Sequence, residues 1–258
     1  MSFRLDDVTM EYGFGRLRVR ALDGITFEAR GAEFISIVGP SGCGKTTLLK
    51  IIAGLLAPTS GRVTFAPASR DGALRSALVF QDHGLLPWYD VLENVALGLR
   101  FQAGDRRQAL DRARQFVAQV GLERFLRHKP RELSIGMRQR VGLARAFVAD
   151  PDILLLDEPF GSLDAQTRMV LQQELLRIWQ LHRKLVVHVT HDIDESILLS
   201  DRILVTSGRP ARIREEITVP FDRPRNHDVL AAAEAVAIRH RIWSILGEEV
   251  RESLCVPA

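Results

Sequence analysis

One stretch decides the fold of this chain, and it reads Gly39-Pro40-Ser41-Gly42-Cys43-Gly44-Lys45-Thr46. It follows the apolar run 34–38 and precedes the run 47–52, so a glycine-rich turn joins a buried strand to a helix. It matches the phosphate-binding pattern G-x-x-x-x-G-K-[ST], whose glycines let backbone N–H groups point inward while the helix N-terminus faces a polyphosphate. Lys45 is expected to bridge the β and γ phosphates and Thr46 to ligate Mg²⁺. The stretch predicts binding of a nucleoside triphosphate.

The composition favours a soluble globular protein with one large domain or two lobes, since the 258 residues are 46% hydrophobic and 26% charged. The 35 Lys and Arg residues are interspersed with 32 Asp and Glu, so there is no one-sided basic surface for a nucleic acid. The basic clusters at 223–225 and 239–241 are therefore expected to be solvated surface. Two cysteines make no disulfide framework, and neither a signal peptide nor an 18-residue apolar span is present. A cytoplasmic protein is expected.

Hydrophobic periodicity predicts an α/β fold in three parts. Short β-rich runs around the phosphate loop indicate an antiparallel lobe, and they lie at 3–8, 25–29, 63–65 and 77–80. From about 90 to 150 the pattern is helical and reads as an insert. Apolar strands then alternate with the helical stretches 164–182 and 192–199, as in a parallel sheet covered by helices, and these strands lie at 153–156, 185–189 and 203–205. A helical extension follows at 228–250, with an apolar stripe of Ile238, Ile242, Ile245 and Leu246.

Two further patterns accompany the phosphate loop. Asp157 and Glu158 stand where the apolar strand 153–156 ends, and ligands of open α/β sheets bind outside the carboxyl ends of strands. Asp157 is positioned to hold Mg²⁺, and Glu158 to orient and deprotonate the attacking water. Ser134 is a natural N-cap for the helix that follows it.

These patterns form an ordered set with Gln81, Ser162-Leu163-Asp164 and Thr190-His191-Asp192. In this order the chain resembles the ATPase subunit of ABC transporters, over about residues 5 to 214. Within that family it is most similar to ATPases of nitrate, sulfonate and taurine importers, and the stretches that carry this likeness are 80–88, 136–140 and 157–164. The resemblance implies a P-loop NTPase (RecA-like) core with an antiparallel β lobe and a helical subdomain.

The resemblance also implies roles for single residues. Tyr12 would stack on adenine, Gln81 would sense Mg²⁺ and the attacking water, and His191 would contact the γ-phosphate. Ser134 and Gly136 would contact the ATP of a partner subunit, and Asp164 would link the two subunits. The phosphate cradle would extend from the loop to Thr47. Tyr12 also has a simple packing alternative in its strand.

In such an assembly the chain would hydrolyse ATP as a homodimer with ATP between the subunits. Because nothing in the sequence can cross a bilayer, two integral-membrane permease subunits are implied partners, and a solute-binding protein acts through them. Residues 82–90 are expected to dock a permease helix. The chain would lie peripherally on the cytoplasmic face of the inner membrane. The implied domains are 1–220, with the helical insert at about 90–150, and the extension 221–258.

Several alternatives stay open. The chain can serve a lipid or pyrimidine-precursor transporter, or act as a non-transport ABC protein, although it lacks sustained heptads and a second phosphate loop. A non-hydrolysing regulator is a third possibility, because Ile135 occupies a family glycine position. Either Ile135 strains a positive-φ position, so that Ile135→Gly raises turnover, or it packs without strain. Cys43 is either a reactive thiolate, labelled more readily than Cys255, or a sheltered filler.

Overall fold

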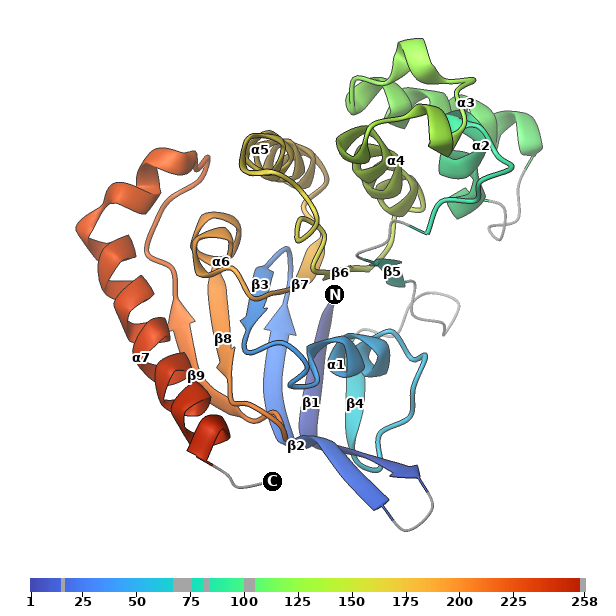
Figure 1. Cartoon of the computed structure of the whole chain (residues 1–258). Helices are drawn as coiled ribbons and strands as arrows, with labels where there is room; N and C mark the ends of the chain where they lie inside the picture. Colours follow the sequence, from blue (N-terminus) through green and yellow to red (C-terminus); the bar gives the residue numbers. More distant parts are fainter. Residues whose placement is uncertain (15–16, 67–75, 81–83, 100–104, 256–258) are drawn as a thin grey trace. The chain divides into compact units, whose positions relative to one another are not determined.

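The computed structural model describes residues 1–14, 17–66, 76–80, 84–99 and 105–255, and Gln81 lies outside these ranges. It forms two compact units (Figure 1). The first unit comprises residues 1–74 and 184–258, and the second comprises residues 75–183. Within the described residues, no helix combines the length and hydropathy that a membrane span needs.

The first unit contains an antiparallel sheet of order β2-β1-β4. Its strands are β1 (Ser2–Phe14), β2 (Leu17–Arg30) and β4 (Ser60–Ala66). Phe3 on β1 is buried, with its ring centroid 5.6 Å from Phe27 and 6.1 Å from Phe65. The alternating apolar residues of these strands thus meet on one face, as the period of a half-buried strand requires. This confirms the strands predicted at 3–8, 25–29 and 63–65.

The same unit contains a second sheet, in which β3 runs parallel to β7 and β8 and β9 lies antiparallel at the edge. Its strands are β7 (Leu185–Thr190), β3 (Phe34–Val38), β8 (Arg202–Thr206) and β9 (Ile213–Thr218). Every residue of β3 and β7 is buried, which explains why both strands read as continuous apolar runs. The parallel arrangement places the residues that follow β3 and β7 at the same edge of the sheet.

Helices α1 (Lys45–Ile52), α6 (Ile193–Leu199) and α7 (Ala233–Cys255) complete the first unit, and the short 3-10 helix η4 (His227–Ala231) precedes α7. The predicted apolar stripe of α7 is confirmed. Ile238 and Ile242 are buried in a cluster with residues of α6, β8 and β9, and Ile245 and Leu246 pack against that cluster. The helix therefore belongs to the core of this unit through one face.

The expectation that residues 223–225 are solvated surface is wrong. Arg225 is buried and donates to the carbonyls of Phe221 and Ser200, while Arg223 donates to Leu199 and to the carboxylate of Asp201. The carbonyls of the last helical turn lack partners within their own helix, and cationic side chains satisfy them and favour the negative end of the helix dipole. Burial lowers the pKa of the Arg225 guanidinium to about 10. These arginines cap α6 instead of lying in solvent.

The second unit combines a short parallel strand pair with helices. Its elements are β5 (Ser76–Val79), α2 (Val91–Ala96), η1 (Leu97–Leu99), α3 (Arg106–Gln119), η2 (Glu123–Phe125), η3 (Pro130–Glu132), α4 (Ile135–Val148), β6 (Ile153–Asp157) and α5 (Ala165–His182). β5 pairs in parallel with β6, so placing 77–80 in the antiparallel lobe was wrong. A four-residue apolar strand carries no local signal for the sheet it joins, and here pairing with Leu154–Leu156 decides it. The predicted domain boundaries stay a prediction.

Candidate nucleotide site

The phosphate loop has the backbone geometry that its glycines predict. It connects β3 to α1, and Gly42 and Gly44 take φ values of 73° and 125°, which only glycine adopts without strain. A Cβ on Gly44 would lie 2.7 Å from the carbonyl oxygen of Ala21. The loop therefore needs glycine at this position both for its backbone angles and for its close approach to β2.

Lys45, the first residue of α1, folds its side chain back over the loop. Its Nζ donates to the carbonyl oxygens of Gly39 and Pro40, both at 2.8 Å, and the residue is only 5% exposed. A buried ammonium beside a helix N-terminus is a strong local attraction for an anion. The amine is thus held at the mouth of the loop, beside the exposed Thr46.

Tyr12 on β1 reaches the start of α1. Its hydroxyl lies 3.1 Å from the Thr47 hydroxyl, and the residue is half-buried. The structure thus brings Tyr12 and Thr47 together, which the sequence alone did not predict. Stacking of Tyr12 on adenine stays a prediction.

The structure favours the sheltered alternative for Cys43. Its side chain is 1% exposed, and its Sγ lies 3.6 Å from the Thr206 hydroxyl. Such burial slows the reaction of a thiol with a maleimide, and preferential labelling of Cys43 stays a prediction. The sequence around Cys43 predicts that it lies near a helix N-terminus, but it does not indicate that Thr206 covers the sulfur.

In the second unit, Asp157 ends β6 and Glu158 follows it. Asp157 is 8% exposed, and Glu158 is half-buried with a φ of 46°. Positive φ is uncommon for a residue with a Cβ, and such backbone strain concentrates at functional sites. The carboxylate pair therefore stands at a strand end, as predicted, in a conformation that the sequence did not indicate.

Ser134 is the N-cap of α4, as predicted: its hydroxyl accepts the Met137 backbone N–H at 3.2 Å. Ile135 is the first residue of α4, is 45% exposed and is not among the described residues with positive φ. The strain hypothesis for Ile135 is therefore wrong, because the position has ordinary helical backbone angles that a β-branched residue can adopt. Ile135→Gly is therefore not expected to relieve backbone strain.

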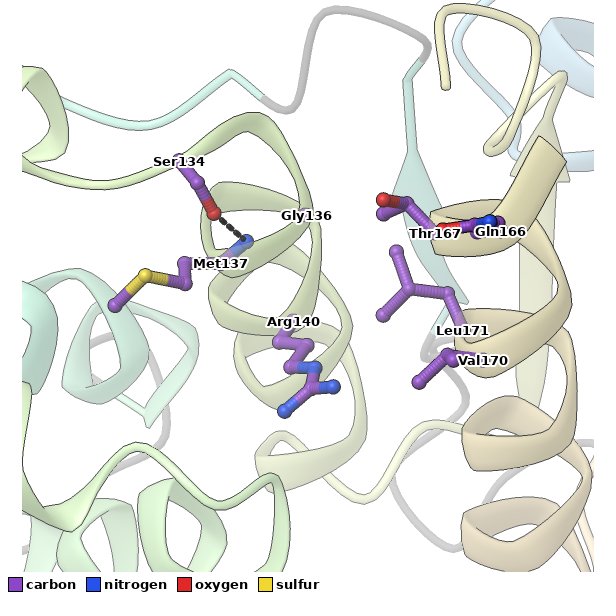
Figure 2. A pocket seen from close by; sticks show the side chains of 8 residues that line it. All are labelled: Ser134, Gly136, Met137, Arg140, Gln166, Thr167, Val170 and Leu171. Atoms are coloured by element: carbon purple, nitrogen blue, oxygen red, sulfur yellow. Dashed lines mark hydrogen bonds between the residues drawn. The ribbon is translucent and has the colours of Figure 1, made fainter. Parts of the chain in front are cut away.

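Helices α4 and α5 line opposite sides of a groove (Figure 2). The groove has a volume of about 320 Å³. Its lining residues are Ser134, Gly136, Met137, Arg140, Gln166, Thr167, Val170 and Leu171. At its end Asp164 caps α5 by accepting the Thr167 backbone N–H at 3.0 Å, and this hydrogen bond lowers the pKa of the carboxyl group. The structure thus brings Ser134, Gly136 and the helix capped by Asp164 together within this unit.

His191 follows β7 directly and is exposed, and the Asp192 backbone N–H donates to the Thr190 hydroxyl at 3.0 Å.

Sequence reasoning missed a segment of the same unit that contacts the phosphate loop. Arg209 donates to the carbonyl oxygen of Gly42 from Nε at 3.2 Å and from Nη2 at 2.8 Å. The pairing of β8 with β3 places the end of β8 beside the start of the loop, and no short run of sequence indicates this pairing.

Comparison with known proteins identifies the class. Residues 22–161 match the family described as ABC transporter. An uncharacterized ABC transporter ATP-binding protein of Methanocaldococcus jannaschii is 44% identical over 98% of this chain and 94% of that protein. The taurine import ATP-binding protein TauB of Burkholderia pseudomallei is 45% identical over 85% of both chains. The aliphatic sulfonates import ATP-binding protein SsuB of Bacillus cereus is 40% identical over 88% of this chain and 89% of that protein.

Among solved structures, a dimeric ATP-binding cassette with bound ADP and phosphate superposes with a TM-score of 0.74, at 34% identity over 85% of this chain and all of that one. The chain belongs to the ABC transporter family and has the α/β fold of a P-loop NTPase, with the antiparallel lobe described above. Subunits of this class hydrolyse ATP to drive transport, and this chain is an ATPase of that class.

Proposed function

We propose that this chain hydrolyses ATP to energise an importer of a small anion such as nitrate, a sulfonate or taurine. The observation that carries the proposal is the phosphate loop, with Lys45 buried against its carbonyls at the start of α1. The anion is supported by likeness to taurine and aliphatic sulfonate import proteins at 40–45% identity. Which of these anions is carried lies with the permease, because the transported molecule does not touch the ATPase.

The ATP phosphates are proposed to lie on the loop, with Lys45 as the cation and Thr47 extending the cradle. For Mg²⁺ the proposed oxygen donors are Thr46, Gln81 and Asp157. Among the described residues no group of three or more His, Cys, Asp or Glu could hold a metal by itself. That fits Mg²⁺, which usually binds one or two protein ligands together with substrate phosphates. When bound, the ion would neutralise charge on the phosphate oxygens.

Glu158 is proposed to accept the proton of the attacking water, and His191 to contact the γ-phosphate. Both are polar side chains directly after strands, where the backbone rather than a long flexible loop fixes their position. Phosphoryl transfer depends on positioning and charge stabilisation more than on covalent chemistry. Holding the base on the strained backbone of Glu158 serves that need.

A second copy of the chain is the proposed partner at Ser134, Gly136 and Asp164. Support comes from the dimeric cassette that this chain resembles and from the exposure of Ser134 at a helix N-terminus. A two-fold dimer would complete two such sites at once. ATP binding would then favour the closed dimer, and hydrolysis the open one.

Two permease subunits are the proposed membrane partners, with a solute-binding protein acting through them on the cytoplasmic chain. Trp88 supports a docking position near residues 82–90, because 62% of its surface is exposed although it is large and apolar. The Lys129 ammonium donates to the Trp88 carbonyl at 3.0 Å and fixes the backbone there. No role on nucleic acid is proposed.

The variant Glu158→Gln tests this function. We expect it to bind Mg-ATP with native affinity but to lose turnover by about 10²-fold to 10⁴-fold, because the amide cannot accept the proton. Binding is followed by calorimetry and turnover by phosphate release, with purified protein. Lys45→Ala should weaken binding itself, and the exposed Glu123→Gln is the matched control with native values. Turnover of Glu158→Gln within twofold of native would exclude the base role. Uptake of labelled taurine, nitrate or an alkyl sulfonate by the reconstituted transporter then separates the anions.

A further inference from the structure

The turn that follows β8 contacts the phosphate loop at several points, all within the first unit. We call residues 206–212 the clasp. Thr206 is 1% exposed, and its hydroxyl donates to the Val38 carbonyl at 3.3 Å. The same hydroxyl would lie 2.0 Å from a Cβ built on Gly39, so its close approach excludes any side chain at the start of the loop. With the Cys43 contact described above, Thr206 touches both the start and the middle of the loop.

The clasp is itself fixed to the antiparallel sheet. The Ala211 backbone N–H donates to the Ala21 carbonyl at 2.9 Å, and the Asp23 N–H donates to the Ala211 carbonyl at 3.0 Å. The Arg212 Nε donates to the Asp23 carboxylate at 2.7 Å. Ser207 closes the turn, because its hydroxyl donates to the Pro210 carbonyl and accepts the Arg212 N–H, both at 2.9 Å. These hydrogen bonds fix the turn from which the Arg209 side chain reaches the loop.

Arg209 holds one peptide group of the loop in a defined orientation. Two of its N–H groups, on Nε and Nη2, converge on the carbonyl oxygen of Gly42. Because the peptide is planar and trans, fixing this oxygen also fixes the Cys43 N–H, which points the opposite way. That N–H donates to the Pro40 carbonyl at 3.4 Å and closes a turn within the loop. The guanidinium also polarises the peptide, which makes the Cys43 N–H a stronger donor.

We infer that Arg209 is a positioning residue for nucleotide binding: it holds the Gly42–Cys43 peptide, and with it the turn from Pro40 to Cys43, so that the loop keeps the shape that binds a polyphosphate before the ligand arrives. The inference rests on the proposed function, in which this loop binds ATP. Its effect is on affinity. When only a fraction of molecules has the competent loop, the apparent Kd rises by the inverse of that fraction, while saturating nucleotide refills the competent state and leaves kcat unchanged.

The test compares Arg209→Met, Arg209→Lys and the control Arg112→Met, which removes one charge from an exposed site on α3. We expect Arg209→Met to raise the Kd and KM for Mg-ATP by about fivefold to tenfold, with kcat within about twofold. Arg209→Lys should restore only part of the affinity, since an ammonium lacks the paired planar N–H groups. Hydrogen exchange of the peptide containing residues 39–45 should be faster in Arg209→Met without nucleotide, while the thermal midpoint stays near native.

Several results would overturn the inference. These are a native Kd for Arg209→Met, unchanged exchange at residues 39–45, or full restoration by Arg209→Lys, which would assign the effect to charge alone. A fall in kcat at constant KM would likewise contradict it. The native protein separates this failure from that of the proposed function. If it does not bind Mg-ATP, the function fails, whereas native binding with an indifferent Arg209 rejects only the positioning role.

Discussion

A single buried histidine shows how one residue constrains the core of the first unit. His188 lies on β7 with none of its surface exposed, and its Nδ1 is 3.1 Å from the Ser36 hydroxyl. Its Nε2 lies 2.6 Å from a carboxylate oxygen of Glu195, which is 4% exposed on α6. Burying a polar group costs free energy unless the group has a hydrogen-bonding partner. The three side chains on β3, β7 and α6 therefore depend on one another as a buried polar network. His188 is thus a structural residue of this core.

We therefore predict that His188→Phe destabilises the protein by about 3 to 5 kcal/mol, because it removes the imidazole from a buried carboxylate. The double variant His188→Phe with Glu195→Met should recover most of that loss, since an apolar pair of similar size leaves no buried polar group without its partner. Urea unfolding followed by fluorescence measures both. A double variant that is no more stable than His188→Phe would show that the pair does not act as a unit.

The elements that could be predicted are those with local signals. Ser134, Asp164 and Asp192 each cap the helix that follows, and each accepts a backbone N–H three residues on, which is why these helix starts fell near their predicted positions. The glycine loop between β3 and α1 is local in the same sense. The sheet joined by β5 was not predictable, because its pairing with β6 spans a long sequence separation.

The candidate site divides in the same way. The loop, the carboxylates after β6 and the N-cap of α4 follow from short runs of sequence, whereas the Arg209 contact with Gly42 joins residues 167 apart. The positive φ of Glu158 could not be predicted either, because Glu has no preference for that backbone conformation. Arg225 was misjudged for a related reason. Its burial depends on the carbonyls at the end of α6, which sequence proximity does not indicate.

The packing of α4 on α5 yields a prediction at the scale of elements. A Cβ on Gly136 would lie 2.9 Å from the Thr167 Cγ2, too close for two carbon atoms. Gly136→Ala should therefore push the two helices apart and destabilise the protein by about 1 to 3 kcal/mol, despite the better helix propensity of alanine. Thr167→Ser removes the methyl group concerned and should restore most of the loss in the double variant. Chemical unfolding provides the measurement.

The chain offers a matched control for this substitution. Gly247 lies in α7, and nothing is within 4 Å of its Cβ position. Gly247→Ala should stabilise the protein by about 0.5 to 1 kcal/mol through helix propensity alone. If Gly136→Ala behaves like Gly247→Ala, the close contact with Thr167 does not limit the spacing of the helices.

At the scale of the whole molecule, positive and negative charges nearly balance, but the pKa values of individual carboxyl groups are shifted in different directions. Hydrogen bonds from arginines lower the pKa of three half-buried carboxyl groups, with Arg4 acting on Asp6, Arg212 on Asp23 and Arg30 on Glu28. Asp164 has a lowered pKa because of the Thr167 backbone N–H. Glu33 is the opposite case, because burial raises its pKa in spite of Arg202. The groups with lowered pKa values favour the folded state above their unfolded pKa, and Glu33 acts in the opposite sense.

A carboxyl group with a lowered folded pKa contributes stability above its unfolded pKa and loses it as the pH falls through the folded value. The free energy of unfolding should therefore decline as the pH drops below about 5. Asp23→Asn should flatten this decline, because one group with a lowered pKa no longer titrates. Glu33→Gln should steepen it, since Glu33 has a raised folded pKa and gains stability on protonation. Urea midpoints between pH 7 and pH 3 measure the slopes. Asp23→Asn and Glu33→Gln changing the slope in the same direction would contradict the assigned signs, because the two shifts oppose each other.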